Sequence, residues 1–151
     1  MEYVKNFEND LEIGRKRERE LASILLSSKK PIDKIEFAPP KKFYDWDLKI
    51  TSLGKETTYE VKQDFKGQYT GNVALEYECD GKPSGISTSK SDYYVICPRE
   101  WEFYFQSRPV LLSKLMEAWF KGVMWGDGNK SKMFLITPER IPEFFIRLKR
   151  Q

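Results

Sequence analysis

Asp47, Glu60 and Lys62 are the residues of this chain whose types and spacing could do chemistry together. Asp47 belongs to the segment Tyr-Asp-Trp-Asp-Leu-Lys-Ile at 44–50, and Glu60 and Lys62 belong to Tyr-Glu-Val-Lys at 59–62. Because strand side chains alternate between two faces, a strand at 59–62 would place Glu60 and Lys62 on the same face. Two carboxylates and a lysine gathered in this way can hold a divalent cation and a nucleophilic water, which is chemistry for cutting a phosphodiester.

A further carboxylate belongs to the first predicted helix. Apolar residues recur at helical spacing over residues 9–28, and Glu18 shares a face of that helix with Leu21 and Leu25. Glu18 is therefore expected to face the core, where a carboxylate is costly unless it is paired or binds a metal. A salt bridge at the edge of the core would satisfy the same side chain, so Glu18 taken alone does not decide between a ligand and an ion pair.

Glu20 lies two residues further along the same helix and points in a different direction. Lys16 and Arg17 precede it by one helical turn, so Glu20 is expected to be directed more toward solvent than Glu18. Ile24, one turn after Glu20, is an apolar neighbour that argues the other way. The prediction is that Glu18, and not Glu20, belongs to the site.

The absence of histidine narrows the chemistry. It excludes a Ser-His-Asp triad, a Cys-His pair and a histidine general base, so a hydrolase of this composition must use carboxylates, a lysine and a bound metal. The hard oxygens of Glu18, Asp47 and Glu60 select Mg²⁺, for which Mn²⁺ is expected to substitute. Lys62 would stand beside the metal-bound water, to orient it or to take part in proton transfer.

The composition indicates one globular domain that spans residues 1–151. Hydrophobic residues make up 40% of the chain, which is typical of a folded protein. No apolar run approaches the ~18 residues of a membrane span, and the N-terminus lacks the apolar stretch of a signal peptide, so a cytoplasmic protein is expected. The net charge is only +3, but basic residues cluster at 15–19 and 147–150, which suits a polyanion such as DNA.

The elements that must position these residues form a mixed α/β pattern. Glycine and proline residues separate short runs that favour strands from longer runs that favour helices. Strands are predicted at 46–51, 57–62, 73–78, 92–97 and 132–136, with a further short strand within 32–37, and later helices are predicted at 110–121 and from 137 to 149. The expected fold is α/β, with an N-terminal helix followed by a central mixed β-sheet flanked by helices.

Several further residues are candidates for accessory roles. Glu76 could be an accessory metal ligand, although an exposed acidic side chain explains it as well. Asp45 is a rival of Asp47, and Asp47 is preferred because the strand proper follows it directly. Basic and polar residues of the first helix and the loops are candidates for contact with DNA phosphates, namely Arg15, Arg17, Lys66, Lys82, Ser84 and Lys90.

Taken together, these residues resemble the PD-(D/E)XK nuclease superfamily. Within it the chain is similar to the archaeal-type Holliday junction resolvases, which include phage-encoded relatives. Their first helix carries a Gly-x-x-x-Glu-Arg-x-Leu-like pattern, and residues 14–21 read Gly-Arg-Lys-Arg-Glu-Arg-Glu-Leu. The resemblance assigns the helix glutamate to Glu18, the strand aspartate to Asp47, and the Glu-x-Lys to Glu60 and Lys62.

The resemblance covers residues 14–62 by motif and departs from the family at Trp46, where the family has proline. It implies a restriction-endonuclease-like fold and a Mg²⁺-dependent, structure-selective endodeoxyribonuclease that resolves four-way-junction DNA as a homodimer. Aromatic residues within 101–125 are expected to contribute to the dimer interface. Three alternatives stay open: another nuclease of the same superfamily, a non-catalytic DNA-binding module of the same fold, and a small interaction protein that uses its aromatic surface.

Overall fold

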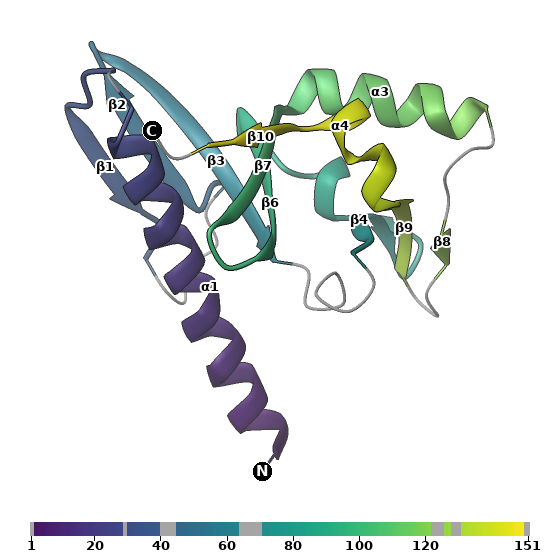
Figure 1. Cartoon of the computed structure of the whole chain (residues 1–151). Helices are drawn as coiled ribbons and strands as arrows, with labels where there is room; N and C mark the ends of the chain where they lie inside the picture. Colours follow the sequence, from purple (N-terminus) through teal and green to yellow (C-terminus); the bar gives the residue numbers. More distant parts are fainter. Residues whose placement is uncertain are drawn as a thin grey trace.

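The structure, a computed structural model, describes residues 2–28, 30–39, 45–63, 71–121, 126–127 and 131–149. Within these ranges the side chains are described from residue 12 onward, except at 126–127. The described chain is mixed α/β, and a central mixed sheet is flanked by helices, which confirms the fold prediction at this coarse level (Figure 1).

The central sheet has six strands in the order β1-β2-β3-β6-β7-β10. They are β1 (Lys34–Phe37), β2 (Leu48–Ser52), β3 (Lys55–Gln63), β6 (Tyr93–Arg99), β7 (Glu102–Ser107) and β10 (Ile146–Leu148). All neighbours are antiparallel except β3 and β6, which are parallel. Leu53 and Gly54 close the β2–β3 hairpin with φ angles of 51° and 78°, the left-handed backbone that tight hairpin turns require. The two strands that carry the candidate catalytic motifs are therefore joined directly.

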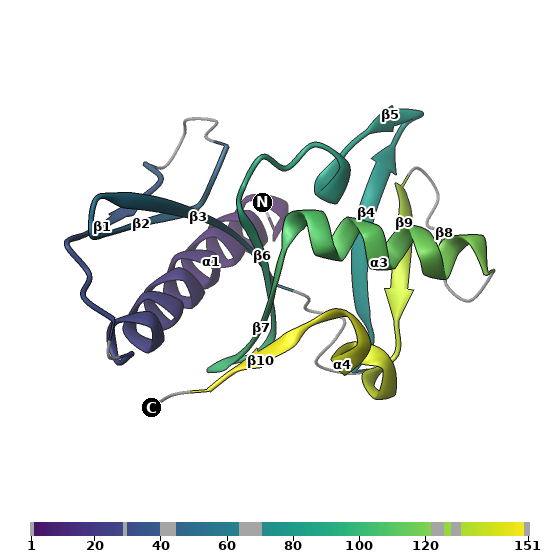
Figure 2. The same cartoon turned by 90° about the horizontal axis from the view of Figure 1, so that it is seen from above.

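A second, four-stranded sheet has the order β5-β4-β9-β8. Its strands are β4 (Val73–Cys79), β5 (Lys82–Pro83), β8 (Gly126–Asp127) and β9 (Ser131–Ile136). The helical segments of the chain are α1 (Glu2–Leu26), η1 (Gly85–Ser87), α3 (Arg108–Phe120), η2 (Pro138–Arg140) and α4 (Ile141–Phe144). Figure 2 shows α3 running across the second sheet, while α1 lies on the other side of the central sheet.

The two faces of the central sheet bury different cores. On one face α1 packs Leu21 and Ile24 into a cluster with Val95. On the other face Tyr94 and Ile96 of β6 meet apolar residues of the second sheet, α3 and α4. None of the helices in the described part of the chain is both long enough and apolar enough to cross a membrane.

Several elements differ from those predicted. Helix α1 begins at Glu2 rather than at residue 9, strands β5, β7 and β8 were not predicted, and the predicted last helix ends at Phe144. Residues Ile146–Leu148 instead form β10, whose backbone pairs with β7. Without β10, β7 would present an unpaired edge, and satisfying those backbone groups outweighs the helical pattern of the local sequence.

Candidate active site

Asp47 is fixed at the start of β2 by hydrogen bonds to β3. Its N–H donates to the carbonyl oxygen of Tyr59 at 2.9 Å, and its Oδ2 accepts a hydrogen bond of 2.8 Å from the N–H of Val61. Val61 stands between Glu60 and Lys62 in the sequence. The carboxylate of Asp47 is thus held beside the middle of the Glu-x-Lys segment.

Glu60 and Lys62 share one face of β3, as strand alternation predicted, while Tyr59 and Val61 pack into the core beneath α1. The Nζ of Lys62 lies 3.5 Å from Oε1 of Glu60, and the Lys62 side chain is 50% exposed. The Oε2 atom of Glu60 is buried and has no hydrogen-bond partner among the described residues. A buried carboxylate oxygen without a partner is costly, and a bound cation or an ordered water would remove that cost.

Glu18 of α1 lies close enough to Asp47 to be affected by its charge. The pKa of Glu18 is raised to about 7, mainly by burial and also by the negative charge of Asp47, against the opposing charges of Arg15 and Arg19. Burial also raises the pKa of Asp47, the Val61 N–H opposes this, and the charge of Glu60 adds to it. Asp47 therefore links the other two carboxylates, because its charge raises the pKa of Glu18 and the charge of Glu60 raises its own pKa.

The raised pKa of Glu18 predicts how stability depends on pH. The folded protein holds this proton up to about pH 7, whereas the unfolded chain loses it near 4.5. A carboxyl whose pKa is raised by folding destabilises the fold once the pH exceeds the unfolded value, so metal-free protein should lose stability between these two pH values. Glu18→Gln should flatten this decline and raise Tm by roughly a few degrees above pH 7, measured by thermal unfolding in EDTA.

Glu12 is the matched control for this prediction, because it is an exposed glutamate on the same helix. Glu12→Gln should follow the wild-type curve of Tm against pH. If Glu18→Gln instead gave a curve parallel to that of the wild type, Glu18 would not be the group that titrates between pH 4.5 and 7.

The donor atoms suit a hard divalent cation. In the described part of the chain no three Asp, Glu or Cys side chains are close enough together to hold one ion, so binding would have to draw the carboxylates closer. Their chemistry nevertheless fits Mg²⁺ or Mn²⁺, because all donors are oxygens and one Glu60 oxygen is buried without a partner among the described residues. A cation would also relieve the repulsion between Glu18 and Asp47. The case for a divalent cation at this site therefore rests on the type of the donor atoms and on the repulsion between the carboxylates.

The structure separates Asp45 from the other carboxylates. The side chain of Asp45 is exposed, and its carbonyl oxygen accepts a hydrogen bond of 2.9 Å from the hydroxyl of Ser91. Glu76 on β4 accepts a hydrogen bond of 3.1 Å from the Ser84 hydroxyl, and its charge reaches Tyr94. Asp47 rather than Asp45 thus lies beside Glu60, and Glu76 belongs to the second sheet, within electrostatic reach of Tyr94.

The prediction that Glu20 points toward solvent was wrong. Glu20 is only 4% exposed, and the Nη1 of Arg17 lies 2.7 Å from its Oε2. The N–H of Trp101 donates to Oε1 at 3.2 Å, so Glu20 ties α1 to the turn between β6 and β7. The apolar neighbour Ile24, 3% exposed, indicated this inward direction, and Arg17 bends over Glu20 because a buried carboxylate needs a counter-charge.

Some of the side chains predicted to contact DNA are already bonded to other residues of the protein, and others are exposed. Arg17 is occupied by Glu20, and Ser84 is bonded to Glu76. Lys66 lies outside the described residues. The remaining side chains are exposed and form no ion pair in the described ranges, namely Arg15, Lys82 and Lys90. Of these, only Arg15 is placed beside the carboxylates, by its effect on the pKa of Glu18.

Two residues near the site were not predicted from the sequence. Tyr94 is 2% exposed and is the direct partner of Glu60 across the parallel β3–β6 pair. Burial raises the pKa of Tyr94, and the charges of Glu60, Asp47 and Glu76 raise it further. Arg19 lowers the pKa of Glu18. Only the pairing of β3 with β6 brings Tyr94 to the site, so no local pattern could have found it.

The site is thus one aspartate beside β2, a Glu-x-Lys on β3 and a glutamate on α1. Comparison of the chain with protein-family models, curated proteins and solved structures found no match. Its function is therefore argued from the residues of the site and their geometry.

Proposed function

We propose that this chain is a metal-dependent endodeoxyribonuclease of the PD-(D/E)XK type. The observation that carries the proposal is the hydrogen bond from the Val61 N–H to the Asp47 carboxylate, which joins the aspartate to the Glu-x-Lys segment. The raised pKa of Glu18, caused in part by Asp47, adds the helix glutamate to the same group. Isolated Glu-x-Lys triplets are common, but their union with two further carboxylates is not expected of a simple solvated hairpin.

Each residue has a role in this proposal. Glu18, Asp47 and Glu60 would hold Mg²⁺ or Mn²⁺, which lowers the pKa of its bound water and offsets charge on the phosphate. Lys62 is half exposed and only loosely paired with Glu60 at 3.5 Å, so its ammonium group is free to turn toward a phosphate or the attacking water. Hydrolysis would form a bond from the water oxygen to phosphorus and break the bond to the leaving oxygen, and Lys62 would be placed to orient the water while solvent takes up its proton and protonates the leaving oxygen.

A restriction-endonuclease-like fold is part of the proposal. It is supported by the position of α1 before the sheet, by the β2–β3 hairpin that carries the site, and by the parallel pairing of β3 with β6. The segment between β3 and β6 is long, and its described part forms β4, β5 and η1. Glu76 belongs to this segment, on β4. In the proposal the segment affects which DNA substrate is bound and leaves the hydrolytic chemistry to β2, β3 and α1.

We further propose branched DNA, and four-way junctions in particular, as the substrate of a homodimer acting in the cytoplasm. A two-fold dimer would present two sites to two strands of a junction. The outer surface of α3 supports self-association, because Met116 is 45% exposed, Trp119 47% and Phe120 76%. Phe103, which was expected at an interface, is instead buried in the core beneath α1, and Trp125 lies outside the described residues.

A cleavage assay tests both the proposed nuclease activity and the proposed preference for branched DNA. The protein is incubated with four-way-junction, flap and linear duplex DNA in Mg²⁺, in Mn²⁺ or in EDTA. We expect paired nicks in the junction with either metal and none in EDTA, because the chain has no histidine to replace metal chemistry. Light scattering should give the mass of a dimer, and affinity for the junction should fall steeply as salt rises.

Other results of the same assay would favour one of the alternative functions. Undiminished cleavage in EDTA would contradict the mechanism. If a monomer cut duplex and junction DNA at equal rates in the presence of metal, the assignment as a nuclease would stand and the assignment as a junction resolvase would be wrong. Binding of DNA without cleavage in any metal would favour a non-catalytic DNA-binding module, and no affinity for DNA would favour a protein-interaction role.

A further inference from the structure

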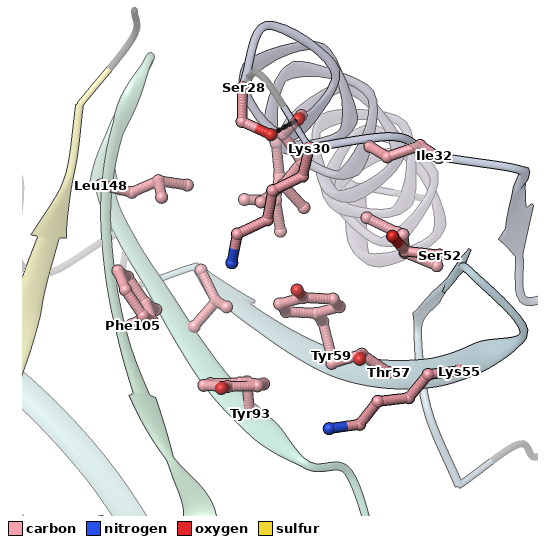
Figure 3. Close-up of a pocket in the computed structure, with 14 residues that line it drawn as sticks. Ser28, Lys30, Ile32, Ser52, Lys55, Thr57, Tyr59, Tyr93, Phe105 and Leu148 are labelled. Atoms are coloured by element: carbon pink, nitrogen blue, oxygen red, sulfur yellow. Dashed lines mark hydrogen bonds between the residues drawn. The ribbon is translucent and has the colours of Figure 1, made fainter.

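A cavity lies between the C-terminal end of α1 and the central sheet, on the face opposite Glu60 and Lys62 (Figure 3). Its volume is about 410 Å³, within the ~300–1,000 Å³ of typical small-molecule sites. Strand alternation separates it from the candidate active site, because Tyr59 lines the cavity while the next residue, Glu60, turns to the other face. The proposed nuclease chemistry gives this cavity no role.

Aromatic and aliphatic side chains form the body of the cavity. The rings of Tyr59 and Tyr93 are stacked with centroids 5.4 Å apart, and the ring of Phe105 lies 5.9 Å from that of Tyr93. These three rings make a row across β3, β6 and β7. Leu21 and Leu25 of α1 also line the cavity. The walls therefore suit an apolar chain or ring.

Positive charge lies at the edge of the cavity and is not neutralised within it. Lys30 and Lys55 both line the cavity, no Asp or Glu is among the described residues that line it, and neither lysine forms an ion pair in the described ranges. By contrast, Lys34 and Lys49 on the neighbouring strands are both paired with Glu36. Figure 3 shows the Lys30 side chain reaching into the space above Tyr59 and the Lys55 side chain running along its lower edge.

The hydroxyl groups of the cavity add hydrogen-bond donors rather than negative charge. Burial raises the pKa of Tyr59 to about 12, so its phenol stays protonated at neutral pH. The nearby carboxylate of Asp92 is engaged elsewhere, since it accepts hydrogen bonds from the N–H and the hydroxyl of Thr58 at 2.9 and 3.1 Å. Lys30 and Lys55 approach Tyr59 from opposite sides, so an anion on either side would meet an ammonium group without facing a lining carboxylate (Figure 3).

We propose that this cavity is a binding site for a small amphipathic anion, an apolar chain or ring that ends in a carboxylate, phosphate or sulfonate group. The apolar part would lie on the row formed by Tyr59, Tyr93 and Phe105, and the anionic group would lie beside one of the two ammonium groups, that of Lys30 or that of Lys55. The site is distinct from the candidate active site, and its existence does not depend on nuclease activity.

The test uses the full chain and 1-anilinonaphthalene-8-sulfonate, a fluorescent probe with an apolar ring system and one sulfonate. We expect saturable binding of one probe per chain, displaced by decanoate or decyl phosphate and not by decanol or decyltrimethylammonium. The more effective of the two anions identifies the head group. The double variant Lys30→Gln/Lys55→Gln should weaken binding of the probe about tenfold, because the charge-assisted contact with the sulfonate is lost whichever lysine makes it.

Lys82→Gln/Lys90→Gln is the matched control, because these two lysines are also exposed and do not line the cavity. It should bind the probe as the wild type does, and circular dichroism should show both double variants to be folded. Thr57→Phe, which places a ring at the cavity wall, should also weaken the probe. Equal displacement by decanol, displacement by a nucleoside monophosphate alone, or unchanged affinity in Lys30→Gln/Lys55→Gln would overturn the proposal.

Discussion

Asp47→Asn and Glu60→Gln should each lower the rate of DNA cleavage by at least ~100-fold, because each removes a proposed metal ligand. Neither substitution should unfold the protein. The amide oxygen introduced by Asp47→Asn can still accept from the Val61 N–H, and Glu60→Gln removes the charge from a buried carboxylate whose Oε2 has no partner among the described residues. DNA affinity should persist or increase, because negative charge is removed from a surface that faces phosphates. Single-turnover cleavage and DNA binding, measured on the same preparations, separate the two effects.

Asp45→Asn is the control for this pair, because Asp45 lies two residues before Asp47 and is exposed. It should cleave at close to the wild-type rate. Lys62→Met should also reduce turnover by at least ~100-fold, as loss of a proton-transfer group does. If Asp45→Asn were the damaging substitution and Asp47→Asn the mild one, the site assignment would be wrong.

Glu20→Ala should destabilise the fold by about 3 kcal/mol, which is a loss of roughly 6–12 °C in Tm for a chain of this length. The substitution leaves Arg17, only 16% exposed, without its counter-charge, and it removes the acceptor of the Trp101 N–H. The same network connects α1 to the β6–β7 turn through the 3.1 Å contact of Lys16 with Glu100. Urea unfolding of the wild type and the variant gives the difference in free energy directly.

Glu117→Ala is the matched comparison, because it breaks an ion pair with Lys121 whose two side chains are 66% exposed. It should cost much less stability than Glu20→Ala, because an exposed ion pair is screened by solvent. The double variant Arg17→Leu/Glu20→Leu leaves no unpaired charge and should recover much of the stability lost in Glu20→Ala. Equal losses in Glu20→Ala and Glu117→Ala would show that burial of the Arg17–Glu20 pair is not what stabilises it.

Sequence patterns predicted the positions of side chains correctly where a single strand or hairpin determines them. The alternation of β3 placed Glu60 and Lys62 on one face, and the glycine after Leu53 marked the turn that joins β2 to β3. The alignment of Asp47 with Val61 follows from that hairpin, because a short turn fixes the register of the two strands. This is why the candidate site could be assembled from two short segments of sequence.

Sequence patterns gave the wrong structure, or none, where contact with a segment far away in the sequence determines it. Glu20 is buried against the β6–β7 turn, where Trp101, far away in the sequence, donates a hydrogen bond to its carboxylate. The last segment forms a strand because β7 offers it an edge, and Tyr94 reaches the site through the parallel pairing of β3 with β6.

The sequence by itself determined the chemistry available to this protein: carboxylates and a lysine in a chain without histidine, on elements whose periodicity is local. The tertiary structure alone decided which carboxylates meet, which one is locked in an ion pair, and where a cavity remains between α1 and the central sheet. The physical reason is that hydrogen-bond satisfaction and charge pairing are settled between elements, whereas side-chain alternation is settled within one.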